Sequence, residues 1–124
     1  MTPIKNIDKL QAYALDVLEG LQYIHSQGVI HSDMKLQNLL LDRPTAEEKA
    51  EGDLPRVKIC DFGLSHIRDP KLDGKSQMLT RCGTQGYIAP EVQKKDTVIG
   101  PEIDMWAFGV MLYEMCSAYK PTVL

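Results

Sequence analysis

Apolar side chains occupy nearly every position between Ile103 and Cys116, and this run constrains the fold more than any other feature. Only Asp104, Gly109 and Glu114 interrupt it. A helix that is apolar all round has to be covered on every side. We therefore expect a central helix from residue 102 onward, with the rest of the chain packed around it as one small domain.

A second helix is predicted from Ile7 to Gln27. Its apolar residues recur at three- and four-residue spacing, which is the pattern of one helix face. Gly28 supplies a C-terminal stop. Short strands are predicted at residues 29–31, 39–41 and 57–60.

Two stretches lack such periodicity. Residues 42–56 are charged and contain few strand formers, so we interpret them as a tolerated surface loop with a helical turn over residues 46–50. Residues 68–102 carry Gly, Pro, Ser and Thr at intervals. A structureless stretch of that length is typical of either disorder or a functional segment.

Charge and composition exclude several classes of function. A net charge of −3 gives no reason to expect a nucleic acid or an anionic membrane as partner. The most apolar run, Met105 to Tyr113, is far shorter than the roughly 20 residues that cross a bilayer. The first eight residues contain no signal core, and the three cysteines are an odd number that suits a reducing compartment. We expect an intracellular, cytoplasmic protein.

Four ordered blocks contain the residues that can do chemistry. The first combines a carboxylate, an ammonium and an amide on a tight loop, and the second places a carboxylate directly after a strand. The third is rich in small and turn-forming residues, and the fourth opens the apolar helix. The blocks are His31-Ser32-Asp33-Met34-Lys35-Leu36-Gln37-Asn38, Asp61-Phe62-Gly63, Gly83-Thr84-Gln85-Gly86-Tyr87-Ile88-Ala89-Pro90-Glu91 and Asp104-Met105-Trp106-Ala107-Phe108-Gly109.

In this order, the four blocks resemble the eukaryotic-type protein serine/threonine kinases over about residues 7–121. The resemblance implies an α+β, protein-kinase-like fold, mainly helical with short antiparallel strands. Residues 1–124 would be a partial kinase domain, a truncated C-terminal lobe that runs from its first long helix to its buried central helix. The glycine-rich loop, the lysine of the third strand and its partner glutamate are not found in the sequence, so we expect the N-terminal lobe and the last helices to be absent. Without those helices, Trp106, Phe108 and Met111 are expected to lack cover.

The resemblance also implies an activity, namely ATP-dependent phosphoryl transfer to the Ser or Thr hydroxyls of a protein substrate, with ATP and Mg²⁺ as cofactors. We expect the 124 residues alone to be inactive, because half of the nucleotide cleft would be missing. The alternative is a noncatalytic partial pseudokinase that serves as an interaction module. The presence of four polar residues favours the enzyme, since a pure binding module has no physical need for this set. They are Asp33, Lys35, Asn38 and Asp61.

The resemblance implies roles for individual residues in and beside the first two blocks. Asp33 would orient or accept the proton of the substrate hydroxyl, and Lys35 would sit beside the transferring phosphate as a point charge. Asn38 and Asp61 would offer oxygen ligands to Mg²⁺, which takes few protein ligands and shares the nucleotide phosphates. Leu40 would form the apolar floor beneath adenine.

Other positions are assigned with competing interpretations. Thr84 would hydrogen-bond Asp33 and Lys35, although an ordinary turn threonine would look the same. Met111 and Met115 would support the adenine floor or simply fill the core. His31 and Phe62 are read as packing partners, and Cys60, next to the nucleotide pocket, as a small buried apolar residue.

Ser32 departs from the family's usual pattern, in which an arginine at this position pairs with a phosphate on the activation segment. Thr80 lies at the usual phosphorylation position. Without the arginine, such a phosphate would lose its main partner, although His66 or Arg68 could replace it. We therefore predict a kinase whose activity does not depend on a phosphate at Thr80.

Overall fold

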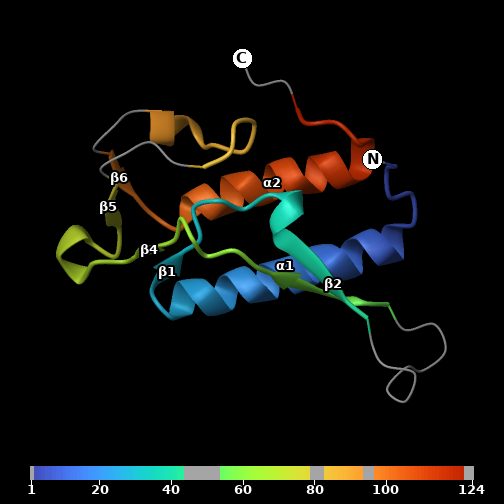
Figure 1. Ribbon diagram of the computed structural model, residues 1–124, viewed down its shortest axis with the longest axis horizontal. Coiled ribbons are helices and arrows are strands. Elements are labelled where there is room, and N and C mark those ends of the chain that lie inside the picture. The colour runs from blue at the N-terminus through green and yellow to red at the C-terminus, as the bar shows by residue number, and fades with distance from the viewer. Residues whose placement is uncertain (1, 44–53, 79–82, 94–96, 122–124) are drawn as a thin grey trace.

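The computed structural model describes residues 2–43, 54–78, 83–93 and 97–121. Two α-helices dominate it, α1 over Ile7–Ser26 and α2 over Glu102–Ser117. They run side by side in opposite directions (Figure 1). Both helices predicted from the sequence are therefore present, whereas the predicted helical turn at 46–50 lies outside the described residues.

Local chemistry explains the bounds of α1. The side chain of Asn6 caps the helix, since its Oδ1 accepts a hydrogen bond of 3.1 Å from the amide of Lys9. The chain leaves the helix through Gly28, whose φ of 79° lies in the left-handed region that glycine tolerates. The face that α1 buries carries Tyr13, Val17 and Leu21.

Among the described residues, the strands are short and pair antiparallel in three separate ribbons. β1 (Val29–Ile30) pairs with β4 (His66–Ile67), β2 (Leu39–Asp42) with β3 (Arg56–Ile59), and β5 (Ser76–Met78) with β6 (Thr97–Ile99). The same ranges contain 3-10 helices at Leu36–Asn38, Pro70–Leu72 and Pro90–Gln93. The described part of the region without sequence periodicity thus contains β5, β6 and two of these 3-10 helices.

The β2–β3 ribbon packs against α1 and is hydrogen-bonded to it. Strand β3 lies against the helix, and Asp16 on α1 accepts a hydrogen bond of 2.9 Å from the amide of Val57. The same carboxylate lies 3.0 Å from the guanidinium of Arg56. Because β2 pairs with β3, this attachment fixes the strand that follows the first chemical block.

The larger of two buried apolar clusters in the described residues lies between the two helices and this ribbon. Val17, Leu21 and Met34 are almost fully buried there, together with Met111 of α2. Of the three residues of α2 expected to lack cover, Trp106 is 38% exposed, as expected, whereas Phe108 and Met111 are buried, so the expectation is wrong for these two. Tyr113 is 52% exposed, because the described elements pack against only part of the helix surface.

Candidate active site

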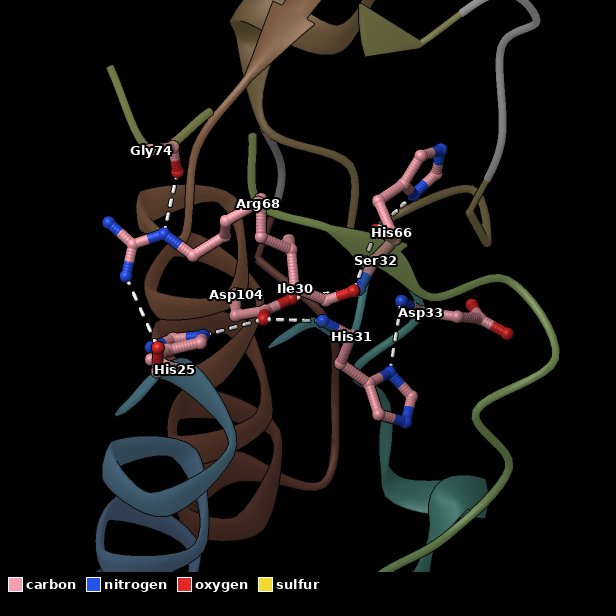
Figure 2. Close-up of polar contacts among 9 residues, drawn as sticks. All are labelled: His25, Ile30, His31, Ser32, Asp33, His66, Arg68, Gly74 and Asp104. Carbon is pink, nitrogen blue, oxygen red and sulfur yellow. Dashed lines mark hydrogen bonds and ion pairs between the residues drawn. The ribbon is translucent and has the colours of Figure 1, made fainter. Parts of the chain in front are cut away.

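Asp104, at the start of α2, organises the loop that carries the first chemical block. Its carboxylate is buried and accepts hydrogen bonds from the backbone amides of His31 and Ser32, at 2.8 and 3.0 Å. The ring Nε2 of His25, at the end of α1, lies 2.8 Å from the same group. Figure 2 shows Asp104 between these partners. One carboxylate therefore joins both helices to the loop.

His31 connects this loop to the strand before Asp61. Its ring is completely buried, and Nδ1 accepts a hydrogen bond of 3.1 Å from the amide of Asp33. Nε2 then carries the proton and donates to the carbonyl of Cys60 over 2.9 Å. The rings of His31 and Phe62 meet edge to face, with centroids 4.9 Å apart. The contact between the rings and the burial of His31 agree with the packing role expected for His31. Phe62 was expected to be core as well, but it is 42% exposed among the described residues, so that expectation is wrong.

Asp33, Lys35 and Thr84 form one hydrogen-bonded cluster. The hydroxyl of Thr84 donates to Asp33 Oδ1 over 2.8 Å, and Lys35 Nζ donates to the same hydroxyl oxygen over 2.8 Å. Lys35 Nζ also lies 3.7 Å from Asp33 Oδ2. Three residues that are up to 51 positions apart in the sequence thus converge on one point.

Asn38, at the end of the loop that begins with His31, is hydrogen-bonded to Asp33. Its amide nitrogen donates to the backbone carbonyl of Asp33 over 2.8 Å, and lies 3.4 Å from that residue's Oδ2. Since the nitrogen serves as donor, the amide oxygen is the atom of Asn38 that could bind a cation. The backbone carbonyl of Asn38 accepts a hydrogen bond of 2.8 Å from the amide of Cys60.

Asp61 follows Cys60 and is therefore held next to Asn38. Its backbone is left-handed, with a φ of 61°, and its side chain is exposed. Oδ1 accepts a hydrogen bond of 3.2 Å from the amide of Gly63. A carboxylate and an amide oxygen fit Mg²⁺, a hard ion that completes its shell with water and phosphate oxygens. Within the described ranges, no three His, Cys, Asp or Glu side chains form a self-sufficient metal site.

A comparison with known protein families decides what this arrangement belongs to. The model for the protein kinase domain matches residues 3–123. The chain is a member of the protein kinase domain family. The family and the fold class predicted from the four sequence blocks are therefore confirmed.

Curated protein kinases show the same relationship. The chain is 41% identical over 111 residues to the human "Protein kinase C delta type", covering 88% of this chain and 14% of that protein. It is 40% identical over 105 residues to "Calcium/calmodulin-dependent protein kinase type 1" of Macrobrachium nipponense, with coverage of 85% and 27%. For "CBL-interacting protein kinase 30" of Oryza sativa subsp. japonica the identity is 40% over 109 residues, with coverage of 88% and 21%. The chain thus spans about a quarter or less of these relatives.

Leu40, predicted from the sequence as a site residue, lies on β2 and stands apart from the hydrogen-bonded cluster. It pairs with Lys58 across the β2–β3 ribbon and is 56% exposed, so its apolar surface is available to a ligand. Its neighbour Leu39 packs against the core instead. Met111 and Met115 are buried, and this supports the core interpretation of the two methionines. Cys60 is half-buried, and its thiol faces the carbonyl of Asn38 at 3.2 Å.

The phosphorylation position predicted from the sequence, Thr80, lies outside the described residues. Among the helices that are described, none combines the length and apolar character needed to cross a membrane.

Sequence reasoning missed the partnership of Tyr87 with Glu114. The tyrosine hydroxyl donates a hydrogen bond to Glu114 Oε1. Burial, followed by this bond and the charge of Glu114, raises the pKa of Tyr87 above its ordinary value. Lys120 Nζ lies 4.7 Å from the centre of the same ring. The signal in the sequence was Glu114 itself, an acid that interrupts the apolar run of α2 far from the acidic residues at the start of that helix.

Proposed function

We propose that this chain is part of a protein serine/threonine kinase that transfers the terminal phosphoryl group of ATP to Ser or Thr hydroxyls of a protein substrate. The observation that carries the proposal is the cluster in which Thr84 bridges Asp33 and Lys35. It gathers a proton acceptor and a cation around a single point, as phosphoryl transfer requires. We further propose that the kinase acts inside the cell, in the cytoplasm.

Each side chain has a distinct task in this proposal. Thr84 holds Oδ1 of Asp33, so Oδ2 is the atom that orients the substrate hydroxyl and takes its proton. Lys35 Nζ stands 3.7 Å from that oxygen and offers its charge to the phosphate oxygens. Asn38 and Asp61 hold Mg²⁺, which when bound neutralises the charge of the nucleotide phosphates. Leu40 offers an apolar surface to adenine.

The test is a transfer assay on the complete polypeptide encoded by the gene. With Mg²⁺ and labelled ATP we expect label on Ser or Thr of a general protein substrate, and none without Mg²⁺. Residues 1–124 alone are expected to transfer nothing. If the complete polypeptide bound partners but transferred no phosphate under any of these conditions, the interaction-module alternative would replace the enzyme.

The bridging hydroxyl gives a first prediction. Replacing Thr84 by valine keeps the shape of the side chain and removes the group that links Asp33 to Lys35. We expect kcat of the complete polypeptide to fall about 10- to 100-fold, because a small misplacement of catalytic groups has effects of this size. Steady-state kinetics measures the change, and Thr84→Ser, which keeps the hydroxyl, should retain most activity. Equal activity of the valine and serine variants would show that Thr84 is an ordinary turn residue.

A further inference from the structure

Ser32 occupies a conformation that its surroundings have to maintain. Its φ of 72° is left-handed, which a residue with a Cβ adopts only when neighbouring contacts hold it there. The amide of Ser32 is held by Asp104 at 3.0 Å. The next residue is Asp33, so the backbone at Ser32 sets the direction from which the Asp33 carboxylate enters the cluster with Thr84.

A second contact holds the side chain of Ser32. Its hydroxyl lies 2.9 Å from Nδ1 of His66, and 3.4 Å from the carbonyl of Ile30. Figure 2 shows the imidazole above the serine. His66 reaches this place because β4 pairs with β1, with His66 opposite Ile30. The contact joins residues 34 positions apart.

His66 also belongs to the segment that begins at Asp61. Only four residues separate the two, and Ser65 stabilises the intervening turn, since its amide and hydroxyl both bond to the carbonyl of Phe62. The Ser32–His66 contact therefore joins the residue before Asp33 to the strand that follows Asp61. Besides the hydrogen bonds of Cys60 with His31 and Asn38 on the strand side of Asp61, this direct contact links the Asp33 loop to the chain that follows Asp61.

We propose that His66 is a positioning residue that acts through Ser32 to fix the geometry of Asp33 relative to Asp61; this rests on the function proposed above. The contact between Ser32 and His66 is direct and needs no phosphate to bridge the two side chains. Arg68, which the sequence also offered as a partner for a phosphate at Thr80, forms hydrogen bonds elsewhere. Its Nε donates to the carbonyl of Gly74 over 2.6 Å and its Nη1 to that of His25 over 3.2 Å.

The kinetic test uses the complete polypeptide with His66→Ala, Ser32→Ala and the double variant. We expect each single change to lower kcat about tenfold, with the KM for ATP unchanged, because the nucleotide ligands are not touched. The double variant should be no slower than either single one, since both remove the same contact. Undiminished kcat in His66→Ala, a loss confined to KM, or losses that multiply would each overturn the proposal.

Two conservative variants separate positioning from mere packing. Asparagine at position 66 places an amide atom where Nδ1 stands, whereas glutamine carries its amide one carbon further. We expect His66→Asn to recover most of the wild-type kcat and His66→Gln to remain as slow as His66→Ala. Equal rates for the asparagine and alanine variants would contradict the proposal.

A readout without turnover keeps this inference distinct from the proposed function. In amide hydrogen exchange of the complete polypeptide, the peptide covering residues 29–35 should exchange faster in His66→Ala and at the wild-type rate in His66→Asn. A wild-type protein that transfers no phosphate would contradict the proposed function alone, and exchange would still decide whether His66 fixes the loop. Unchanged exchange in His66→Ala would overturn the inference.

Discussion

Replacing Asp33 by asparagine will lower kcat of the complete kinase by about 10²- to 10⁴-fold, which is the range that a positioned proton acceptor contributes. Asparagine has nearly the same shape, and its oxygen can still accept the 2.8 Å hydrogen bond from Thr84. It cannot accept the proton of a hydroxyl, and it removes the negative charge 3.7 Å from Lys35 Nζ. The change therefore tests the chemistry of the residue more than the fold of the loop.

The measurement is single-turnover phosphoryl transfer alongside nucleotide binding. We expect nucleotide affinity to stay near that of the wild type, because Asp33 is not among the residues assigned to the nucleotide or the metal. Asp42→Asn is the matched control. This exposed carboxylate on β2 pairs only with the exposed Lys58 among the described residues, at 2.7 Å, and its loss should leave kcat unchanged. An Asp33→Asn protein that retained wild-type turnover would remove Asp33 from the mechanism.

The second large effect concerns stability. Replacing Asp104 by alanine should destabilise the complete polypeptide by about 3–5 kcal/mol, the cost of breaking a buried, hydrogen-bonded charge. The carboxylate is only 1% exposed. Its removal leaves the buried amide of His31 and the half-buried amide of Ser32 without their acceptor, and it removes the partner of His25 at the end of α1.

Urea unfolding of the complete polypeptide measures this change. Asp104→Asn keeps one acceptor oxygen in place, so we expect a smaller loss of stability than for alanine. Glu102→Ala is the control on the same helix end, because that exposed acid contributes only a favourable interaction with the helix dipole, about 0.3–1 kcal/mol. Equal unfolding free energies for Asp104→Ala and Glu102→Ala would show that the contacts of Asp104 add little stability.

The elements that the sequence predicted well are those with local signals. The spacing of apolar residues predicted α1, and the structure ends it at Ser26, within one residue of the predicted Gln27. The short strand before Asp61 was also predicted, and is shifted by a single residue to Arg56–Ile59. These signals are local because a helix or strand repeats every few residues along the chain.

The covering of α2 was predicted only in part, because Trp106, Phe108 and Met111 were all expected to lack cover and only Trp106 does. The sequence of α2 is apolar on all sides, but periodicity reports only that a side chain is apolar, and does not report what packs against it. Ile103, Phe108 and Met111 are buried in the described structure, whereas Met105 and Trp106 stay partly exposed. The extent of burial depends on which elements lie beside each face of the helix.

By itself, the sequence determined the family, the positions of Asp33, Lys35, Asn38 and Asp61, and the two helices, because ordered motifs and short periods are properties of a linear chain. The tertiary structure alone decided partners for which neither a motif nor a period gives a signal. His25 meets Asp104, 79 residues further along the chain, and Ser32 meets His66. Hydrogen bonds form between groups that packing brings within about 3 Å of each other, and no local pattern encodes that distance.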